Sequence, residues 1–294
     1  MQFAGFASPA ELTSLLVTAR LLVSTRTIMT LRERMGFDVG DQLSIQDALE
    51  WARSNDVHHL DIKLQRYLPD GFSDSEAEDI KNRCDTYDIR LGVHTSSSVN
   101  MAENHPFVGE ATDEYLFSHI DTARRIGAHW VIVHGGYHFS SDVDDRFRAS
   151  VSRLSRAVEY ANGTGVKLLL ENHNPEPDTA EVHYLPTTPK ECERYLSELS
   201  AESIGWAFNP AHAYLSDAGI PEFVSALGTD RIGEIRLNDN RGHMEEHLPP
   251  GDGTIDFKEL FDLLEPEYDG RYILSYGTPD QMLSGKEYLL SEIV

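Results

Sequence analysis

Residues 167–173 read KLLLENH, a short apolar run that ends in a carboxylate and an imidazole. The preceding residues 146–162 have helical periodicity, and Gly163 and Gly165 follow them where a helix stop is expected. A helical stretch next to a short β-rich apolar run is typical of a βαβ unit. The stretch therefore predicts a buried strand with Glu171 at its carboxyl end.

The same alternation continues in both directions from this unit. Eight apolar runs are predicted to be strands, at residues 35–39, 58–64, 89–94, 130–134, 167–171, 204–209, 232–238 and 271–276. The clearest helical stretches are residues 44–55, 112–126, 146–162, 256–264 and 286–293. Eight strands alternating with eight helices, with no repeat or low-complexity linker, predict an α/β protein with a single (β/α)8 TIM barrel. A doubly wound open sheet is the alternative, but it requires a glycine-rich phosphate turn after an early strand, which is missing here.

The length and the first residues suggest how the chain is divided. A chain of 294 residues suits one barrel of roughly 250 residues. Residues 1–34 contain four Arg and two acids, and they lack the pattern of a signal peptide. We expect residues 1–34 to be a dispensable extension, which is either a capping helix or sequence upstream of the true start. The barrel is then expected to span residues 35–294.

The charge balance narrows the set of partners. The chain has 49 acidic and 25 basic residues, and a net charge of −24. No basic stripe interrupts this acidity, so we expect no nucleic-acid partner. Strong acidity with only six Lys resembles proteins of salt-loving cytoplasms, and two distant cysteines fit a reducing compartment. No apolar run approaches the roughly 20 residues that span a bilayer. We expect a soluble, halophilic, cytoplasmic protein without a membrane partner, and leave open whether it is a homo-oligomer.

Polar residues gather where the predicted strands end. In such barrels the catalytic groups lie at the carboxyl ends of strands and in the loops beyond them. These positions hold His94, His134, Glu171, His173, Asn209, His212, Arg236, Asn238, Asp239, Glu245 and His247. Imidazole and carboxylate groups bind divalent metal ions, and they also move a proton beside a carbonyl. We therefore expect six of these side chains to line one pocket: His94, His134, Glu171, His212, Arg236 and His247. Lys63, near another strand end, is either a substrate contact or a solvated strand end.

Three motifs resemble a known family. LLLENH, FNPAHAYL and IRLNDNRGHMEEHLPPGDGTIDF are similar to stretches of the xylose-isomerase-like barrels. That superfamily includes sugar isomerases, sugar epimerases and the apurinic endonucleases of DNA repair. The resemblance runs from about residue 35 to the C-terminus.

The resemblance to the metal-dependent epimerases implies a single-metal site that this chain does not reproduce. Glu171 matches the first of four family ligands, whereas Asn209, Arg236 and Ser275 stand at the other three. Asn209 can offer a neutral oxygen, but a guanidinium stays protonated and cannot ligate. Ser275 is a poor ligand.

The resemblance to the three-zinc endonucleases implies a different arrangement. Their first site maps to His94, His134 and Glu171, and their third to His212, Glu245 and His247. The middle site has lost its ligands. These six residues are therefore the candidate ligands of a divalent metal (Zn, Mn or Mg). Arg236 then takes the emptied position, where it holds Glu171 ionised and binds an anionic substrate group; alternatively, it only forms a salt bridge with Glu171 or Asp239.

Three functions remain in competition. The first is an intramolecular isomerase or epimerase for a sugar or sugar phosphate, possessing the catalytic residues Glu171, His212 and Arg236 and the substrate contacts His94, His134, Asn209, Asp239 and His247. The second is a zinc phosphodiesterase of the apurinic-endonuclease kind. The third is a barrel that only binds a ligand.

Overall fold

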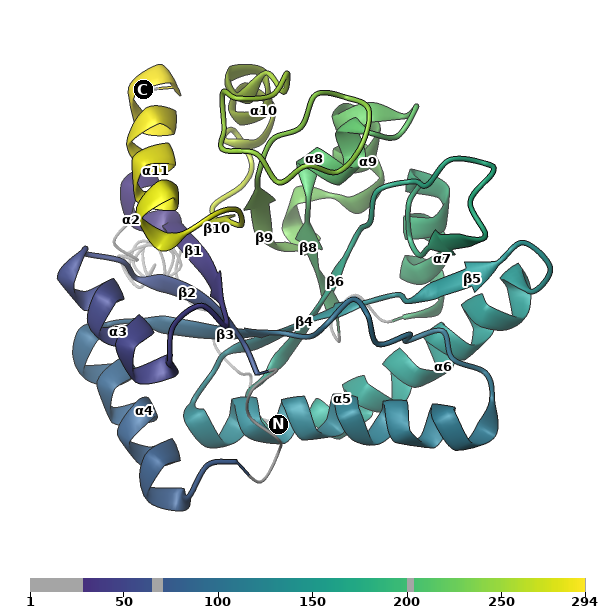
Figure 1. The fold of residues 1–294 in the computed structure, drawn as a ribbon, viewed down its shortest axis with the longest axis horizontal. Helices are drawn as coiled ribbons and strands as arrows, with labels where there is room; N and C mark the ends of the chain where they lie inside the picture. The colour runs from purple at the N-terminus through teal and green to yellow at the C-terminus, as the bar shows by residue number, and fades with distance from the viewer. Residues whose placement is uncertain (1–28, 65–70, 200–203, 294) are drawn as a thin grey trace, which may run out of the picture. The chain divides into compact units, whose positions relative to one another are not determined.

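The barrel unit, from Leu31 onward, is built on a closed sheet of eight parallel strands (Figure 1). The computed structural model describes residues 29–64, 71–199 and 204–293. Each strand pairs with the next one along the chain, and the last pairs with the first. The strands are β1 (Met35–Gly40), β2 (His59–Lys63), β3 (Arg90–His94), β4 (Trp130–His134), β6 (Lys167–Glu171), β8 (Ile204–Phe208), β9 (Ile232–Leu237) and β10 (Arg271–Leu274). All eight predicted strands and the single TIM barrel are confirmed.

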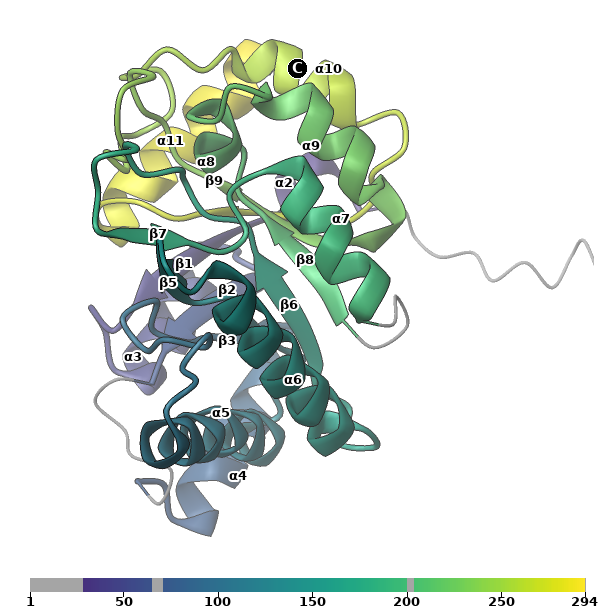
Figure 2. The same ribbon diagram turned by 90° about the vertical axis from the view of Figure 1, so that its right-hand side faces the viewer.

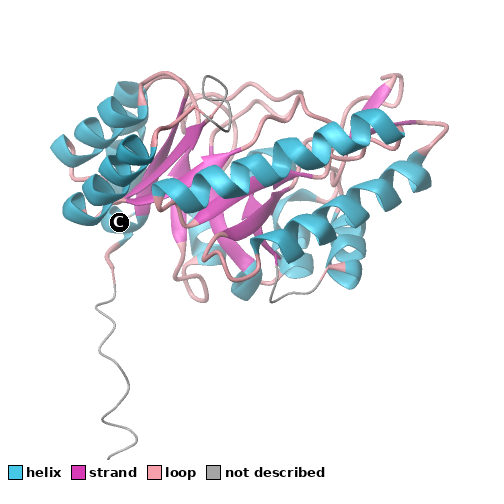
Figure 3. Ribbon diagram, turned by 90° about the horizontal axis from the view of Figure 1, so that it is seen from below, coloured by secondary structure: helices cyan, strands magenta, loops and turns pink. Residues whose placement is uncertain are grey.

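Helices cover the outside of the sheet, which lies inside them when the barrel is seen from below (Figure 3). One main helix follows each strand: α3 (Ile45–Ser54), α4 (Asp74–Tyr87), α5 (Pro106–Ile126), α6 (Val143–Ala161), α7 (Pro189–Glu198), α9 (Gly219–Leu227), α10 (Phe257–Leu264) and α11 (Pro279–Ile293). The loop after β8 adds the short α8 (Pro210–Tyr214), and the 3-10 turn η1 (Thr229–Arg231) precedes β9. Figure 2 shows α5 and α6 packed against each other on the outer surface. In the described part of the chain, no helix combines the length and the apolarity needed to cross a membrane.

Three helices begin earlier than the apolar periodicity predicted: α6 by three residues, and two others by six or seven. The helix expected at residues 112–126 starts at Pro106, and the one expected at 286–293 starts at Pro279. Proline is favoured in the first turn of a helix, because its missing N–H has no intrahelical partner there. The first turns of these helices lack the apolar period, so the pattern alone missed them.

A small antiparallel sheet stands on the loops above the barrel. It pairs β5 (Tyr137–Phe139) with β7 (Val182–Tyr184), from the loops after β4 and β6. Neither β5 nor β7 is among the eight strands predicted from the sequence. The pairing joins the two loops next to the ends of the strands that carry His134 and Glu171.

Alternation along the strands sends charged groups into the barrel. Side chains of successive strand residues point to opposite faces. In β4, Val131 and Val133 join the core beneath the helices, whereas Trp130 and Ile132 form a second cluster with Leu169 and Ala207. By the same alternation Asp61 and Lys63 of β2, and Glu234 and Arg236 of β9, face the interior. The barrel interior therefore contains an apolar cluster and, in contact with it, charged side chains, since Trp130 donates to Asp61 and Ala207 is in register with Glu234.

The barrel unit includes four residues before Met35, the residue at which we expected the barrel to begin. The helix α2 (Leu31–Arg34) belongs to the barrel unit, and Arg34 is buried. Its guanidinium donates to the carbonyl oxygens of Gly270 (2.7 Å) and Tyr268 (2.8 Å), and to Glu265 (2.9 Å). The dispensability of residues 1–28 stays a prediction, because they lie outside the described residues.

Replacing Arg34 with alanine should lower the melting temperature by several degrees. The substitution leaves two backbone carbonyls and a carboxylate without their donor, which costs about 1–3 kcal/mol, and 1 kcal/mol shifts the midpoint of a domain of this size by about 2–4 °C. Arg32→Ala is the matched control, because Arg32 pairs with Glu287 on the exposed surface and such pairs contribute little. Equal midpoints for the two variants in a thermal scan would contradict this assignment.

Candidate active site

A cavity of about 330 Å³ lies at the carboxyl ends of the strands. Its walls include all six residues that we expected to share one pocket: His94, His134, Glu171, His212, Arg236 and His247. The other lining residues that matter below are Asp38, Lys63, His173, Asn209, Glu245 and Ser275. These six residues therefore share one cavity, as expected from the sequence, and the role of each depends on its contacts.

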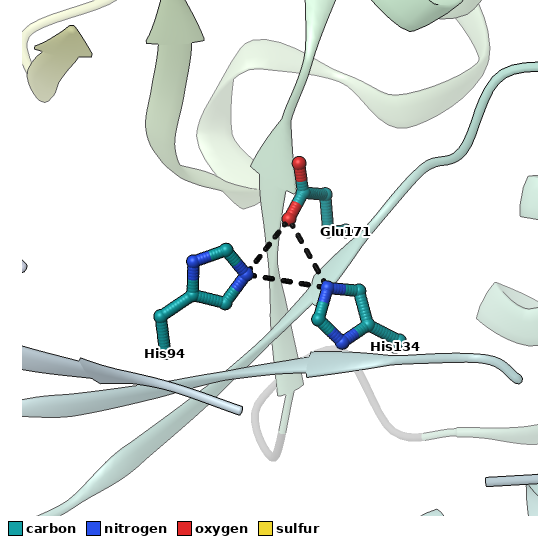
Figure 4. Close-up of side chains that lie close together, drawn as sticks. All are labelled: His94, His134 and Glu171. Atoms are coloured by element: carbon teal, nitrogen blue, oxygen red, sulfur yellow. Dashed lines mark hydrogen bonds and ion pairs between the residues drawn. The ribbon is translucent and has the colours of Figure 1, made fainter. Parts of the chain in front are cut away.

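Three of these side chains converge closely (Figure 4). The Nε2 atoms of His94 and His134 are 3.2 Å apart, and each lies 3.4 Å from Oε2 of Glu171. Their ligand atoms all lie within 4.8 Å of one another, and all three side chains are buried. The group could hold a metal ion, as the sequence analysis expected.

Neighbouring groups set which nitrogen of each imidazole carries the proton. Nδ1 of His94 lies 2.9 Å from a carboxylate oxygen of Asp38, which can only accept, so this nitrogen is the donor. The hydroxyl of Thr95 donates to the carbonyl of Ile132, which leaves its oxygen to accept from Nδ1 of His134 at 3.4 Å. Both Nε2 atoms then present lone pairs to the centre of the group. A second hydrogen bond that orients a metal-binding histidine in this way is typical of metal sites.

The charge state of the group also fits a divalent cation. Burial lowers the pKa of His134 to about 4, so this ring is neutral near pH 7. Burial favours the neutral form of Glu171, but the nearby charge of Arg236 is the largest opposing effect, and the pKa of Glu171 lies well below the usual range. Two nitrogen lone pairs and a carboxylate oxygen face one another at short distance with no proton between them. A cation removes this repulsion, and imidazole and carboxylate ligands suit zinc.

Arg236 stands beneath this group, surrounded by carboxylates. Its guanidinium pairs with Glu171 (3.3 Å), Asp61 (3.1 Å), Glu234 (2.8 Å) and Asp38, and Arg236 itself is buried. The four acids come from β6, β2, β9 and β1. The guanidinium therefore supplies the positive charge at the middle of the barrel.

The ionic network continues below Arg236. Arg271 pairs with the second oxygen of Glu234 at 3.0 Å and lies over the ring of Trp130. The indole N–H of Trp130 donates to Asp61 at 2.9 Å. Burial and the nearby Glu234 raise the pKa of Asp61 well above its ordinary value. The raised pKa favours the neutral form of Asp61, which lessens the repulsion among the clustered acids.

The sequence suggested that Arg236 binds an anionic substrate group, but the contacts that the structure gives it are with groups of the protein. All three guanidinium nitrogens face carboxylates, and Nη2 also lies 3.2 Å from Nδ1 of His94, so the guanidinium is held by partners inside the protein. The alternative, a salt bridge of Arg236 with Glu171 or Asp239, is observed for Glu171, whereas the acids that pair with Arg236 in the described residues do not include Asp239. The sequence could not reveal this saturation, because Asp38 and Asp61 lie 198 and 175 residues away along the chain.

The side-chain oxygen of Asn209, a neutral oxygen that could have served as a ligand, is engaged within the protein. Its Oδ1 accepts from the backbone N–H groups of Ala211 (3.1 Å) and His212 (3.2 Å), and so caps α8. Its Nδ2 points to Oε1 of Glu171 at 3.1 Å. Asn209 thus orients Glu171 by donating to it. Its predicted contact with substrate stays a prediction, since it lines the cavity.

A second cluster of ligand-type residues occupies the other side of the cavity. Oε1 of Glu245 lies 2.8 Å from Nε2 of His212 and 2.6 Å from Nε2 of His247. Nδ1 of His212 faces the carbonyl of Asn172 at 2.7 Å and is therefore a donor. Burial lowers the pKa of His212, but its contacts with Glu245 outweigh burial and raise it above the ordinary value. In the described residues, only the first group brings three ligand atoms within 4.8 Å of one another.

His173 lies between the two clusters. Its ring centroid is 5.0 Å from that of His134 and 5.6 Å from that of His212, and its other face stacks on Tyr184. Within the described residues its buried Nε2 has no hydrogen-bond partner. Burial holds its pKa well below the usual range, so the ring is neutral. His173 therefore adds a neutral polar wall between the two clusters.

Asp239 is a structural residue, although we expected it to contact substrate. It does not line the cavity, and it is fully buried. Its carboxylate accepts from the backbone N–H groups of Gly251 (3.0 Å), Gly253 (3.0 Å) and Ile255 (3.2 Å). A side chain at Gly253 would place its Cβ 2.2 Å from this carboxylate, which explains the glycine. Asp239 holds together the loop that carries Glu245 and His247.

Asp38 is a site residue that the sequence analysis missed. It bonds both His94 and Arg236, and so links the candidate metal group to the ionic network. The available signal was an acid at an inward position of an otherwise apolar strand, MGFDVG. Its partners could not be inferred, because they come from β3 and β9.

Replacing Asp38 with asparagine should weaken zinc binding by about ten- to a hundredfold, as is usual when the partner of a metal-binding histidine is lost. The amide can still accept one hydrogen bond but no longer carries the charge that fixes the His94 tautomer. A chelator competition titration measures the affinity, and Asp56→Asn is the surface control. Unchanged affinity in Asp38→Asn would show that Asp38 serves Arg236 alone.

Comparison with known proteins supports the barrel and its family. A family model described as "Xylose isomerase-like TIM barrel" matches residues 49–291. An uncharacterized protein of Methanocaldococcus jannaschii is 34% identical over 194 residues, which cover 63% of this chain and 64% of that relative. The matched region thus spans less than two thirds of this relative's length.

Two solved structures illustrate the range of similar proteins. A D-tagatose 3-epimerase-like protein superposes with a TM-score of 0.75 at 26% identity, covering 88% of this chain and 98% of the other. Endonuclease IV from Thermus thermophilus superposes with a TM-score of 0.68 at 18% identity, covering 88% and 97%, and shows the shared fold alone. The family model covers most of the chain, the closed barrel agrees with it, and the chain therefore belongs to the xylose isomerase-like TIM barrel family.

Proposed function

We propose that this protein is a metal-dependent isomerase or epimerase that moves a proton next to the carbonyl of a small carbohydrate-like substrate. The observation that carries the proposal is the convergence of His94, His134 and Glu171 in a strand-end cavity. A cavity of about 330 Å³ suits a small molecule. The similarity to an epimerase-like structure supports the same interpretation.

The three converging residues are the proposed ligands, and the bound ion would polarise a carbonyl or hydroxyl oxygen of the substrate. Glu171 suits a ligand better than a proton carrier. One of its oxygens faces the two histidines, while Arg236 and Asn209 hold the other. A carboxylate with a strongly depressed pKa is a weak base.

The pair of His212 and Glu245 is better suited to hold or move the proton. His212 is anchored through Nδ1, and its Nε2 lies beside Glu245, which also lines the cavity. The pKa of His212 is raised above the ordinary value, so the protonated ring is favoured. General acid–base groups work best when their pKa lies near the working pH. His94 and His134 then act as ligands and not as direct substrate contacts, and Arg236 acts through Glu171.

A zinc phosphodiesterase is the second candidate, and the cluster of His212, Glu245 and His247 favours it. A second set of imidazole and carboxylate groups beside the first suits a centre with more than one metal ion. Two observations weigh against it: the net charge of −24 opposes a nucleic-acid phosphate backbone, and Arg236 occupies the middle of the ligand set.

Proton exchange in heavy water separates these candidates. Protein loaded with Zn, Mn or Mg is incubated in D2O with a panel of ketoses and ketose phosphates, and NMR follows deuterium uptake at the carbon beside the carbonyl. A duplex with one abasic site is assayed for nicking in parallel. We expect deuterium uptake that is lost in His212→Asn but kept in the exposed control His105→Asn.

Two other results would redirect the assignment. Nicking of the duplex without deuterium uptake would favour the phosphodiesterase. Neither activity, in a protein that still binds metal, would leave a barrel that only binds a ligand.

A further inference from the structure

Lys63 is placed to project into the cavity. It is the last residue of β2, and in the parallel register it pairs with His94 of β3. Registered neighbours on adjacent strands point to the same face of a sheet, and His94 points inward. Lys63 is also two residues after Asp61, which lies inside the barrel. The cavity wall accordingly includes Lys63.

The ammonium of Lys63 is not committed to a protein partner. In the described part of the chain it forms neither an ion pair nor a hydrogen bond. Its stem runs beside Gly40, where a Cβ would lie 4.0 Å from its Cδ. Asp38, a buried acid in the same cavity wall, is already bonded to Arg236 and His94.

Lys63 and Arg236 differ in whether their charge is already paired within the protein. Lys63 and Arg236 are the two Lys or Arg residues that line the cavity among the residues described. Arg236 is buried and each of its guanidinium nitrogens already pairs with a carboxylate of the protein. Lys63 is therefore the cationic side chain of the cavity wall that remains available to a substrate anion, and it lies beside His94 of the candidate metal group.

We propose that Lys63 anchors an anionic group, a phosphate or a carboxylate, of the substrate. An ammonium with three donors on a flexible stem binds such groups as a point charge. The inference rests on the proposed function only in taking this cavity as the place where substrate binds. It replaces Arg236, the residue that the sequence suggested for this role, and it narrows the substrate class to sugars that carry a negative charge.

Binding of simple anions tests the proposal. Isothermal titration of the zinc-loaded protein at fixed ionic strength gives the Kd of inorganic phosphate, with acetate as a second probe that separates phosphate from carboxylate preference. Lys63→Met should raise the Kd of the preferred anion by about ten- to a hundredfold, the usual effect of losing a charge-assisted contact. Lys63→Arg should stay near the wild type, because it keeps the charge.

The controls separate this proposal from the metal assignment. Lys167→Met removes an exposed lysine at the opposite end of the barrel strands and should bind anions like the wild type. Zinc content and melting temperature should be the same in all variants, with Lys63→Gln as a second uncharged variant. Because the readout is anion affinity, loss of the proposed isomerase activity would not affect it.

Two results would overturn the role of Lys63. Unchanged anion affinity in Lys63→Met would show that the metal or other groups hold the anion. No binding of either probe to the wild type at tens of millimolar would show that the cavity has no anion site.

Discussion

Replacing Arg236 with methionine should lower the free energy of unfolding by about 3–5 kcal/mol, the usual cost of removing one partner from a buried ion pair. Methionine keeps much of the length of the side chain but leaves Asp38, Glu171 and Glu234 without their shared cation. With about 2–4 °C per kcal/mol, the melting temperature should fall by roughly 6–20 °C. Arg148→Met, on the exposed surface, is the matched control and should change little.

The difference in melting temperature between the wild type and Arg236→Met should become smaller as the pH falls. In the wild type the depressed pKa of Glu171 contributes stability above the unfolded pKa of about 4, and this contribution is lost as the pH drops. In the variant, burial without a counter-charge raises the folded pKa of these carboxyls, so protonation relieves the repulsion. Thermal scans at pH 5 and pH 8 should therefore show a smaller difference at pH 5.

A second substitution tests whether the destabilisation comes from charge. Asp61 has a raised pKa and accepts from Trp130 through one oxygen, so Asp61→Asn keeps that acceptor while removing the ability of the side chain to ionise. The double variant Arg236→Met/Asp61→Asn should be more stable than the sum of the single changes implies, because contacting residues couple. Additive effects would argue that Arg236 stabilises the barrel by packing instead.

Alanine at His134 should reduce zinc affinity by more than about a hundredfold, because losing even an outer partner of a ligand costs ten- to a hundredfold. Glu171→Gln should behave similarly, since the amide carries no charge and its nitrogen cannot ligate. Zinc at about a hundred times its Kd should stabilise the wild type by about 2.7 kcal/mol and raise its melting temperature, but leave the variants unshifted. His105→Ala, an exposed histidine, is the control.

The position of the ion provides the stricter test. Anomalous scattering from a zinc-soaked crystal should place the ion among His94, His134 and Glu171. Arg236→His should not create a site between Glu171 and Ser275, because the oxygen of Asn209 remains engaged in capping α8. An ion held jointly by Glu171 and Asn209 in the wild type, with Arg236 displaced, would refute this account.

The barrel itself was predictable from local patterns. Each strand is a short apolar run, and each strand end is marked by a polar residue such as His134 after WVIV or Glu171 after KLLL. These signals are local, because side-chain alternation and burial act within a few residues. The halophilic and cytoplasmic expectations rest on composition alone and stay predictions.

The sequence by itself determined which residues reach the rim of the barrel, since strand order places strand ends together. Only the tertiary structure decided what each one does. Asn209 orients Glu171, Asp239 braces a loop, and Arg236 is saturated while Lys63 is free. The physical reason is that the role of a buried polar group depends on its partners, and here these come from strands up to 198 residues apart in the chain.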